Sequence, residues 1–295
     1  MTFTSHTYDD DVVEMQFTPD TLANIDRYVN LATALIYNNT NVSELPAEIG
    51  TCKHLCVLDI RWTNISHLPS TLTKCKKLHK VIIVECANFE LTSDIWKLTH
   101  LHHLTLHGLN LTVLPEDISK LIHLRELDIS NNLLTELPSH LEHLSQLEIL
   151  NVNDNKLTTL PTELRNLKHL QKLFLSNNNL QQLPWFIGEF PNLMVLHAGS
   201  CGLSELPPEL AHCHQLTELY LSRNNLYTLP CEIYTLTNME YLYIHRNCLE
   251  EISRDIIKLQ KLKELYMDDN NLISIPCTRS DFPNIEAFFV DILEE

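Results

Sequence analysis

The sequence predicts an α/β solenoid: a curved, horseshoe-shaped stack of short repeats with a parallel sheet on its concave face and an irregular or 3-10-helical convex side. A 23-residue pattern recurs eleven times over residues 32–284 without an insertion or deletion. Within each repeat two apolar residues flank a single residue, which is the spacing of a strand with one buried face. The 295 residues include 54 leucines but only 5 glycines, a composition that disfavours a glycine-rich phosphate-binding enzyme.

Each repeat follows the pattern L-x-x-L-x-L-x-x-N-x-L-x-x-L-P-x-x-I/L-x-x-L-x-x. The first positions of the repeats are Ala32, Leu55, Leu78, Leu101, Leu124, Leu147, Leu170, Leu193, Leu216, Met239 and Leu262, and a partial twelfth repeat begins at Ile285. Positions 4 and 6 predict one parallel strand per repeat. The apolar residues at positions 11, 14, 18 and 21 are expected to fill the interior as the chain returns, because a single repeat cannot bury its own apolar face.

Two further positions carry a structural signal. Proline occupies position 15 in nine repeats and suits a returning segment outside any hydrogen-bonded ladder. Asparagine at position 9 can satisfy backbone groups of the turn that leaves the strand. The first four repeats lack this asparagine and hold Thr40, Thr63, Cys86 and Leu109. We therefore expect the N-terminal third to be less regular, with its weakest repeat at 78–100, where Thr92 replaces the proline.

This pattern resembles the leucine-rich repeat proteins of the 23-residue intracellular type, among them the Ras-suppressor and Ras-binding scaffold proteins. Some intracellular bacteria also deliver proteins of this kind into host cells. The resemblance covers about 86% of the chain, 253 of 295 residues. It implies a solenoid that binds other proteins.

The ends of the solenoid require covers, because a terminal repeat would otherwise expose its core and an unpaired edge. Residues 1–31 are predicted to hold a mobile tail, up to about residue 16, and a capping helix that begins near Thr18-Pro19-Asp20. Residues 32–284 form the eleven repeats. Residues 285–295 are predicted to form a last cap strand and an acidic tail.

The net charge and the cysteine pattern restrict the partners and the cellular compartment that the sequence predicts. The chain has 21 Lys and Arg against 38 Asp and Glu, a net charge of −17, which disfavours nucleic acid and anionic membrane surfaces. No apolar run is long enough to span a bilayer, no export signal is visible, and the nine cysteines contain no C-x-x-C pair. We predict a cytoplasmic monomer without membrane insertion, in the host cytosol if the chain is a bacterial effector.

Catalysis and metal binding find little support. The chain contains no P-loop, G-x-S-x-G or H-E-x-x-H motif, so we predict a protein that is not an enzyme and needs no cofactor. His79 and His102 occupy position 2 of neighbouring repeats and could face one another. Two imidazoles without a third ligand make a poor metal site, so no metal is predicted and the pair is left open. Five of the cysteines fall at buried repeat positions.

The residues of position 5 point outward from the middle of each strand. In the C-terminal half they form an unbroken aromatic or imidazole series: Phe174, His197, Tyr220, Tyr243, Tyr266 and Phe289. Beside them the sequence places Tyr241, Arg223, His245 and Arg246. Tyrosine and arginine are enriched in interface hot spots, and contiguous exposed patches usually mark contact surfaces. We predict a partner site here, with the tyrosine hydroxyls facing solvent or the partner; the alternative is ordinary cross-strand packing of aromatics.

The other tryptophans give weaker signals. A second patch is predicted around Trp62, Arg61 and Ile82, whereas Trp96 and Trp185 are predicted to be packing residues. Together these observations predict a non-catalytic protein-interaction module that binds a partner protein on the C-terminal half of its concave face. In an intracellular bacterium such a module would be a translocated effector. The alternative is a regulatory subunit that modulates a small GTPase or a protein phosphatase.

Overall fold

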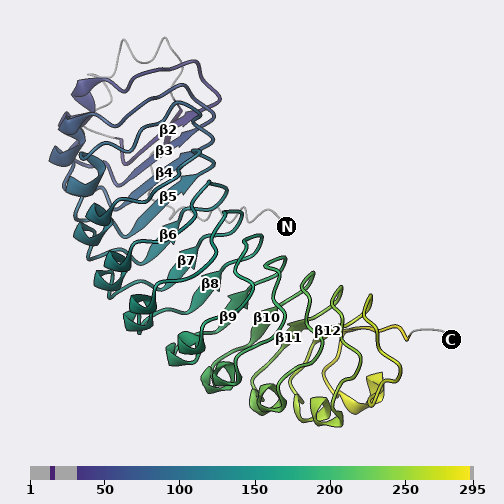
Figure 1. The fold of residues 1–295 in the computed structure, drawn as a ribbon. Coiled ribbons are helices and arrows are strands. Elements are labelled where there is room, and N and C mark those ends of the chain that lie inside the picture. The colour runs from purple at the N-terminus through teal and green to yellow at the C-terminus, as the bar shows by residue number, and fades with distance from the viewer. Residues whose placement is uncertain (1–13, 17–31, 293–295) are drawn as a thin grey trace. The chain divides into compact units, whose positions relative to one another are not determined.

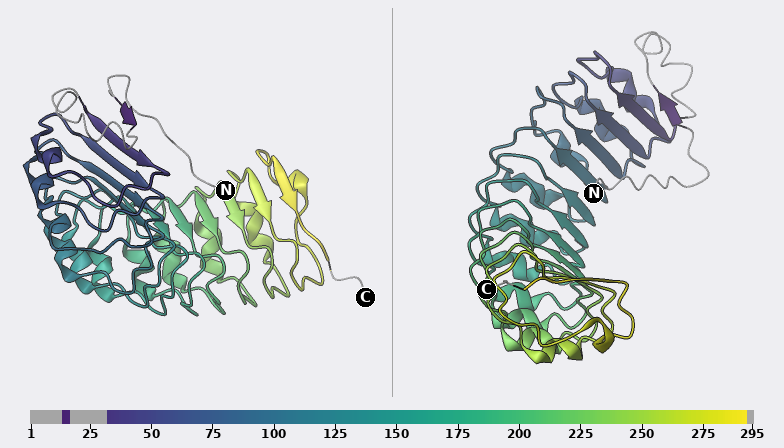
Figure 2. Two further views of the ribbon diagram at one scale, coloured as in Figure 1. Left: turned by 90° about the horizontal axis from the view of Figure 1, so that it is seen from above. Right: turned by 90° about the vertical axis from the view of Figure 1, so that its right-hand side faces the viewer.

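The computed structural model describes residues 14–16 and 32–292. The chain forms two compact units, one ending at Leu109 and the other beginning at Asn110. In both, short parallel strands follow one another in chain order, and 3-10 turns lie on the opposite side of each repeat (Figures 1 and 2). Within the described residues, no helix is long and apolar enough to cross a bilayer.

The N-terminal unit holds five parallel strands among its described residues. Its elements are β1 (Glu14–Gln16), β2 (Ala34–Asn38), η1 (Ala47–Thr51), β3 (Val57–Arg61), η2 (Ser70–Lys74), β4 (Lys80–Val84), η3 (Ile95–Lys97) and β5 (His103–His107). The predicted capping helix near residues 18–29 lies outside the described residues. Strand β1 was not predicted, since its residues were assigned to a mobile tail; it pairs in parallel with β2 and covers that edge.

The C-terminal unit continues the same alternation of strand and turn. Its elements are η4 (Glu116–Lys120), β6 (Glu126–Asp128), η5 (Ser139–His143), β7 (Ile149–Asn151), η6 (Thr162–Asn166), β8 (Lys172–Phe174), η7 (Trp185–Glu189), β9 (Val195–His197), η8 (Pro208–His212), β10 (Glu218–Tyr220), η9 (Cys231–Thr235), β11 (Tyr241–Tyr243), η10 (Arg254–Lys258), β12 (Glu264–Tyr266), η11 (Arg279–Asp281) and β13 (Ala287–Phe289). Strands β6 to β13 pair in parallel with their neighbours.

The repeat register predicts these elements closely. Each of the strands β2 to β13 begins at position 3 of its repeat. Eight of the nine position-15 prolines immediately precede a 3-10 turn, and their carbonyls accept its first hydrogen bond, as Pro138 does from the Leu141 amide. The predicted fold class is therefore confirmed: a repeat solenoid with parallel strands and 3-10 returns.

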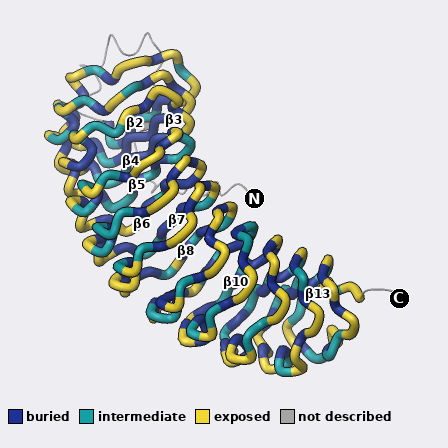
Figure 3. Tube along the Cα trace, viewed as in Figure 1, coloured by how far each residue is buried: buried dark blue, intermediate teal, exposed yellow. Residues whose placement is uncertain are grey.

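The core consists of the apolar repeat positions. Leu150 and Val152, at positions 4 and 6, are fully buried, and the residues between and beyond them are partly exposed. Leu157, Leu164 and Leu167, from the returning segment, close the interior of the same repeat. Figure 3 shows this recurrence of buried segments along successive repeats. Each side chain of this kind contributes on the order of 2 kcal/mol through removal of apolar surface from water.

The position-9 asparagines hydrogen-bond to backbone groups near the strand ends, as predicted, and their buried amides form a ladder from repeat to repeat. The Asn155 amide donates to the carbonyls of Ile129 and Val152, at 3.0 and 3.1 Å, and its Oδ1 accepts from the Leu134 amide at 3.0 Å. The same bridging recurs at Asn178, Asn224, Asn247 and Asn270. Each asparagine thus ties two adjacent repeats together. Where the ladder is interrupted, the Cys201 thiol donates to the Leu175 carbonyl at 3.2 Å and partly replaces the amide.

The expectation of a less regular N-terminal third is wrong for the strands. Strands β2 to β5 have five residues each, whereas β6 to β13 have three. Two of these strands, VLDIR in β3 and KVIIV in β4, contain several β-branched residues, which favour extended backbone. The weak repeat at 78–100 does have a shortened turn, η3, of three residues instead of five.

Every repeat from 32 to 284 places its position-8 residue in the left-handed backbone region. The residues with φ between 51 and 66° at this position include Asn131, Arg223 and Arg246, and one glycine, Gly108. This conformation turns the chain sharply at the end of each strand. For a residue with a Cβ it costs on the order of 1–2 kcal/mol, so the surrounding hydrogen bonds must hold it.

Candidate functional site

The six side chains predicted at position 5 form one row on the face of the sheet made by β8 to β13; we call this row the aromatic column. Its members are Phe174, His197, Tyr220, Tyr243, Tyr266 and Phe289. Each lies directly opposite the next in the strand register. Successive ring centroids are 4.9, 5.5, 5.4, 5.1 and 4.7 Å apart. These are distances of favourable aromatic pairs, so the predicted alignment of the rings is confirmed.

The side chains of the aromatic column lie on the outer face of the strands and are not part of the buried core. Leu219 and Leu221, on either side of Tyr220, are fully buried, whereas Tyr220 itself is partly exposed. At the end of the column Phe289 is 51% exposed. The rings therefore present one edge or face to solvent while their neighbours in the strand anchor the backbone.

Two position-3 glutamates hold rings of the preceding repeat. A Glu218 carboxylate oxygen lies 2.7 Å from His197 Nε2, and the Tyr243 hydroxyl donates to Glu264 at 2.7 Å. The prediction that the tyrosine hydroxyls face solvent or a partner is therefore wrong for Tyr243. Burial and this hydrogen bond raise the pKa of Tyr243 well above its ordinary value, so its hydroxyl remains a donor across the neutral range.

Small residues at position 7 allow the rings to lie close to the backbone. A Cβ on Gly199 would lie 2.6 Å from Cε1 of Tyr220, so only glycine fits beneath that ring as it stands. In the next repeat the Ser222 hydroxyl lies 2.9 Å from Nδ1 of His245. The His245 ring packs 6.2 Å from Tyr220 and 6.1 Å from Tyr266. Burial lowers the pKa of His245, which favours its neutral form.

The remaining predicted site residues flank the column on both sides. Tyr241 is partly exposed and lies beneath the Lys263 ammonium, 5.6 Å from the ring centroid. On the other side Arg223 and Arg246 are exposed position-8 residues in the left-handed conformation. Arg246 pairs with Asp269 at 3.0 Å. All ten predicted site residues therefore lie on or beside one face of β8 to β13.

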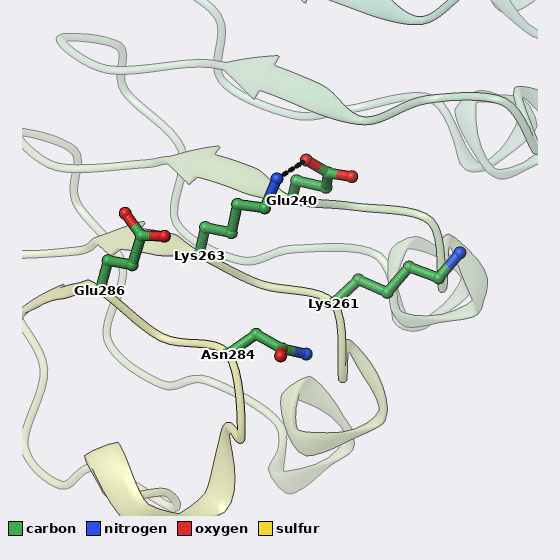
Figure 4. A pocket seen from close by; sticks show the side chains of 5 residues that line it. All are labelled: Glu240, Lys261, Lys263, Asn284 and Glu286. Carbon is green, nitrogen blue, oxygen red and sulfur yellow. Dashed lines mark hydrogen bonds and ion pairs between the residues drawn. The ribbon is translucent and has the colours of Figure 1, made fainter.

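An open pocket of about 290 Å³ lies just before the first residues of strands β11 to β13. It is lined by Glu240, Lys261, Lys263, Asn284 and Glu286 (Figure 4). The Lys263 ammonium contacts a Glu240 carboxylate oxygen at 2.6 Å within it. Its lining is polar throughout, and this ion pair neutralises two of its charges.

The histidine pair and the cysteines show no arrangement of metal ligands. The rings of His79 and His102 meet edge to face, with centroids 6.1 Å apart. In the part of the chain that the structure describes, no group of three His, Cys, Asp or Glu side chains could hold a metal ion. The nine cysteines are free, and burial raises the pKa of Cys75 and Cys201 to about 11.

The weaker tryptophan predictions are only partly right. Trp62 is 53% exposed, but Ile82 is buried, and Arg61 is held by Asp59 through two hydrogen bonds. These three residues therefore form no continuous apolar patch. Trp96 is buried as predicted, whereas Trp185 is 49% exposed and is not a core residue, because position 16 lies at the outer start of the 3-10 turn.

Sequence reasoning missed the residues that fix the rings. Glu218 and Glu264 contact side chains 21 residues earlier in the chain, and Gly199 and Ser222 act across one repeat. Their signal in the sequence is positional: a hydrogen-bonding or small residue at position 3 or 7 beside an aromatic position 5.

Comparisons with known proteins agree with this architecture. A family model described as leucine rich repeat matches residues 99–157, 122–180 and 214–272. No curated protein matches the chain. Among solved structures, a leucine-rich repeat protein of Leptospira interrogans is 25% identical with a TM-score of 0.77, and the match covers 95% of this chain and 77% of that one.

Two further structures resemble the fold alone. A plant peptide hormone receptor, RGFR1 in complex with RGF2, is 24% identical with a TM-score of 0.72, and the match covers 94% of this chain but 46% of the receptor chain. A chain from the octameric complex of Latrophilin 3, Unc5D and FLRT2 is 20% identical with a TM-score of 0.71, covering 89% and 83%. The chain thus spans less than half the length of the receptor. The chain is therefore similar to leucine-rich repeat proteins in the matched repeats and in its fold.

Proposed function

We propose that the chain is a non-catalytic interaction module that binds a partner protein through the aromatic column and its border. The contact residues would be Phe174, His197, Tyr220, Arg223, Tyr241, Tyr243, His245, Arg246, Tyr266 and Phe289. The observation that carries the proposal is the column itself, six rings in contact on a partly exposed sheet face.

Pre-organisation supports this role. The Tyr243 hydroxyl is fixed by Glu264 and His197 by Glu218, so these side chains lose little freedom when a partner covers them. Binding normally costs about 0.5–1.5 kcal/mol for each side chain that must be immobilised. A row of fixed, partly apolar rings therefore retains more of its contact energy than mobile side chains would.

The structural neighbours add support at the level of the fold. One neighbour is a peptide hormone receptor in complex with RGF2, and another belongs to an octameric complex of Latrophilin 3, Unc5D and FLRT2. Repeat solenoids of this kind present extended binding surfaces. We extend this role to the present chain as part of the proposal. Partner identity has to come from experiment.

The experiment compares capture of a partner by two matched variants. Wild type, Tyr243→Ala and Asn151→Ala, each immobilised on beads, are incubated with lysate, and bound proteins are quantified by mass spectrometry. Asn151 occupies position 5 in a repeat outside the column. The proposal predicts proteins retained by wild type and Asn151→Ala but depleted at least tenfold by Tyr243→Ala. Equal retention by all three would contradict it.

A second readout separates scaffold from regulator. The activity of the captured partner, a GTPase or phosphatase if the alternative holds, is measured with and without the chain. Unchanged activity supports a scaffold, and a changed rate supports a regulatory subunit.

We also propose that binding takes place in the cytoplasm, or in the host cytosol if the chain is a translocated effector. The nine free cysteines support a reducing compartment. Labelling of the chain by a cytosol-restricted proximity enzyme in intact cells tests this directly; absence of labelling would contradict it.

A further inference from the structure

The carboxylates of Glu218 and Glu264 lie at the edge of the aromatic column, and each uses only one of its two oxygens as a hydrogen-bond acceptor there. One oxygen of Glu218 contacts His197, and one oxygen of Glu264 accepts from Tyr243. The other oxygen of each has no hydrogen-bond partner among the described residues. Both side chains are partly exposed; that of Glu218 is 32% exposed. Each therefore offers an acceptor directly beside an aromatic ring.

This combination of groups favours a cation. A carboxylate at the edge of an aromatic ring suits a guanidinium, which can pair with the carboxylate and pack against the ring at the same time. The border on this side adds Glu286, while Glu240 is neutralised by Lys263 at 2.6 Å. The whole chain carries a net charge of −17, so it attracts a basic segment over longer distances as well.

The opposite border limits where the cations can lie. Arg223 and Arg246 occupy position 8, and the Arg246 charge is compensated by Asp269 at 3.0 Å. A basic side chain directed to that border would meet Arg223. Near β10 an incoming cation is therefore directed to the side of Glu218, away from Arg223.

The spacing of the two glutamates fits one backbone conformation. They lie on β10 and β12, two strands apart, which is roughly 9.6 Å at the usual strand separation of about 4.8 Å. A polyproline II segment rises about 3.1 Å per residue, so side chains three residues apart are separated by roughly 9.3 Å. Aromatic-lined surfaces also recognise such segments, because they are extended before binding.

We propose that the partner presents a polyproline II segment with arginines three residues apart, whose guanidinium groups pair with Glu218 and Glu264 while the residues between them pack on Tyr220, Tyr243 and Tyr266. This inference rests on the proposed function, since it names the chemistry of the partner at the same site. The tyrosine rings supply the apolar contacts, and the two carboxylates fix which residues of the segment lie over each ring.

Binding of defined peptides to the full chain tests the inference. The probe is a fluorescein-labelled peptide of four Arg-Pro-Pro units, with Gln-Pro-Pro and Glu-Pro-Pro peptides as matched controls, followed by fluorescence anisotropy. We expect the arginine peptide to bind at least tenfold more tightly than the glutamine peptide. Its affinity should fall as salt rises, because the paired charges are partly exposed.

A charge-matched pair of variants locates the contact. The double variant Glu218→Gln/Glu264→Gln should weaken the arginine peptide about tenfold. The control, Glu163→Gln/Glu209→Gln, removes the same charge at the same 46-residue spacing from position 17 on the returning side, and it should bind within twofold of wild type. Circular dichroism and thermal unfolding confirm that wild type and both double variants are folded.

The outcomes also separate this inference from the proposed function. Equal binding of the arginine and glutamine peptides, no effect of Glu218→Gln/Glu264→Gln, or no binding of any peptide to wild type would overturn the inference. Tyr243→Ala decides the proposed function independently: loss of the captured lysate partner upholds that function even when the peptides fail. If the peptides fail and Tyr243→Ala retains every captured protein, both are wrong.

Discussion

At the scale of single residues, the column depends on groups that hold its rings from the side. The Tyr243 hydroxyl donates a hydrogen bond to Glu264, and the His197 imidazole is hydrogen-bonded to Glu218. Gly199, which has no Cβ, leaves room for the Tyr220 ring. The aromatic residues could be read from the sequence, because they recur at one repeat position. Their partners could not, since a glutamate at position 3 is equally compatible with a solvated side chain.

The hydroxyl of Tyr243 makes a measurable contribution to stability. Tyr243→Phe keeps the ring contacts with Tyr220 and Tyr266 but removes the hydrogen bond to Glu264, and should lower the free energy of unfolding by about 1 kcal/mol. Urea titration followed by circular dichroism measures this. Tyr220→Phe is the control, because no side-chain hydrogen bond of the Tyr220 hydroxyl is found among the described residues. Equal stability of Tyr243→Phe and wild type would mean that the bond is absent in solution.

His245 predicts a pH dependence. Burial lowers its pKa in the folded chain, so the unfolded chain, with an ordinary pKa near 6.5, takes up the proton first. The contribution of His245 to stability is full above about pH 6.5 and is lost as the pH falls from there through its lowered folded pKa. Unfolding free energies from pH 8 to pH 5 should fall less steeply for His245→Gln than for wild type. Identical slopes would show that His245 does not titrate differently on folding.

At the scale of repeat elements, one strand, one amide and one 3-10 turn recur in a fixed register. Leu150→Ala removes a fully buried position-4 side chain and should cost on the order of 2–5 kcal/mol. Asn155→Ala leaves the buried amide of Leu134 without its partner and removes one of the two asparagine donors to each of the Ile129 and Val152 carbonyls, so it should cost about 1–3 kcal/mol. Denaturant titration gives both values. A near-zero effect of both changes would contradict the assigned register.

The elements also show where sequence reasoning succeeds and fails. Positions 4, 6 and 9 predicted the strands and the ladder, because burial and backbone hydrogen bonding constrain those residues in every repeat. The left-handed backbone at position 8 was not predicted: it is occupied by residues as different as Asn131, Arg223 and Arg246, so residue type gives no signal there. The five-residue length of strands β2 to β5 was likewise not predicted, because the repeat pattern leaves positions 3, 5 and 7 variable.

At the scale of the whole molecule, the nine cysteines form no disulfides, and their reactivity should show which repeat positions are buried. Cys231 is exposed, whereas Cys201 and Cys213 are buried, and burial raises the pKa of Cys213 to about 12. Native-state maleimide labelling with mass spectrometry should modify Cys231 first and leave Cys201 and Cys213 unmodified until the chain unfolds. Rapid native labelling of Cys213 would contradict the position-21 assignment.

The most direct test of the central claim is the affinity of the captured partner for wild type, Tyr243→Ala and Asn151→Ala, measured by isothermal titration calorimetry. A truncated hot spot costs about 2 kcal/mol or more, roughly thirtyfold in Kd. We expect that loss for Tyr243→Ala and a change within twofold for Asn151→Ala, with both variants folded. If Tyr243→Ala binds the partner as tightly as wild type does, the aromatic column is ordinary strand packing and the proposed site is wrong.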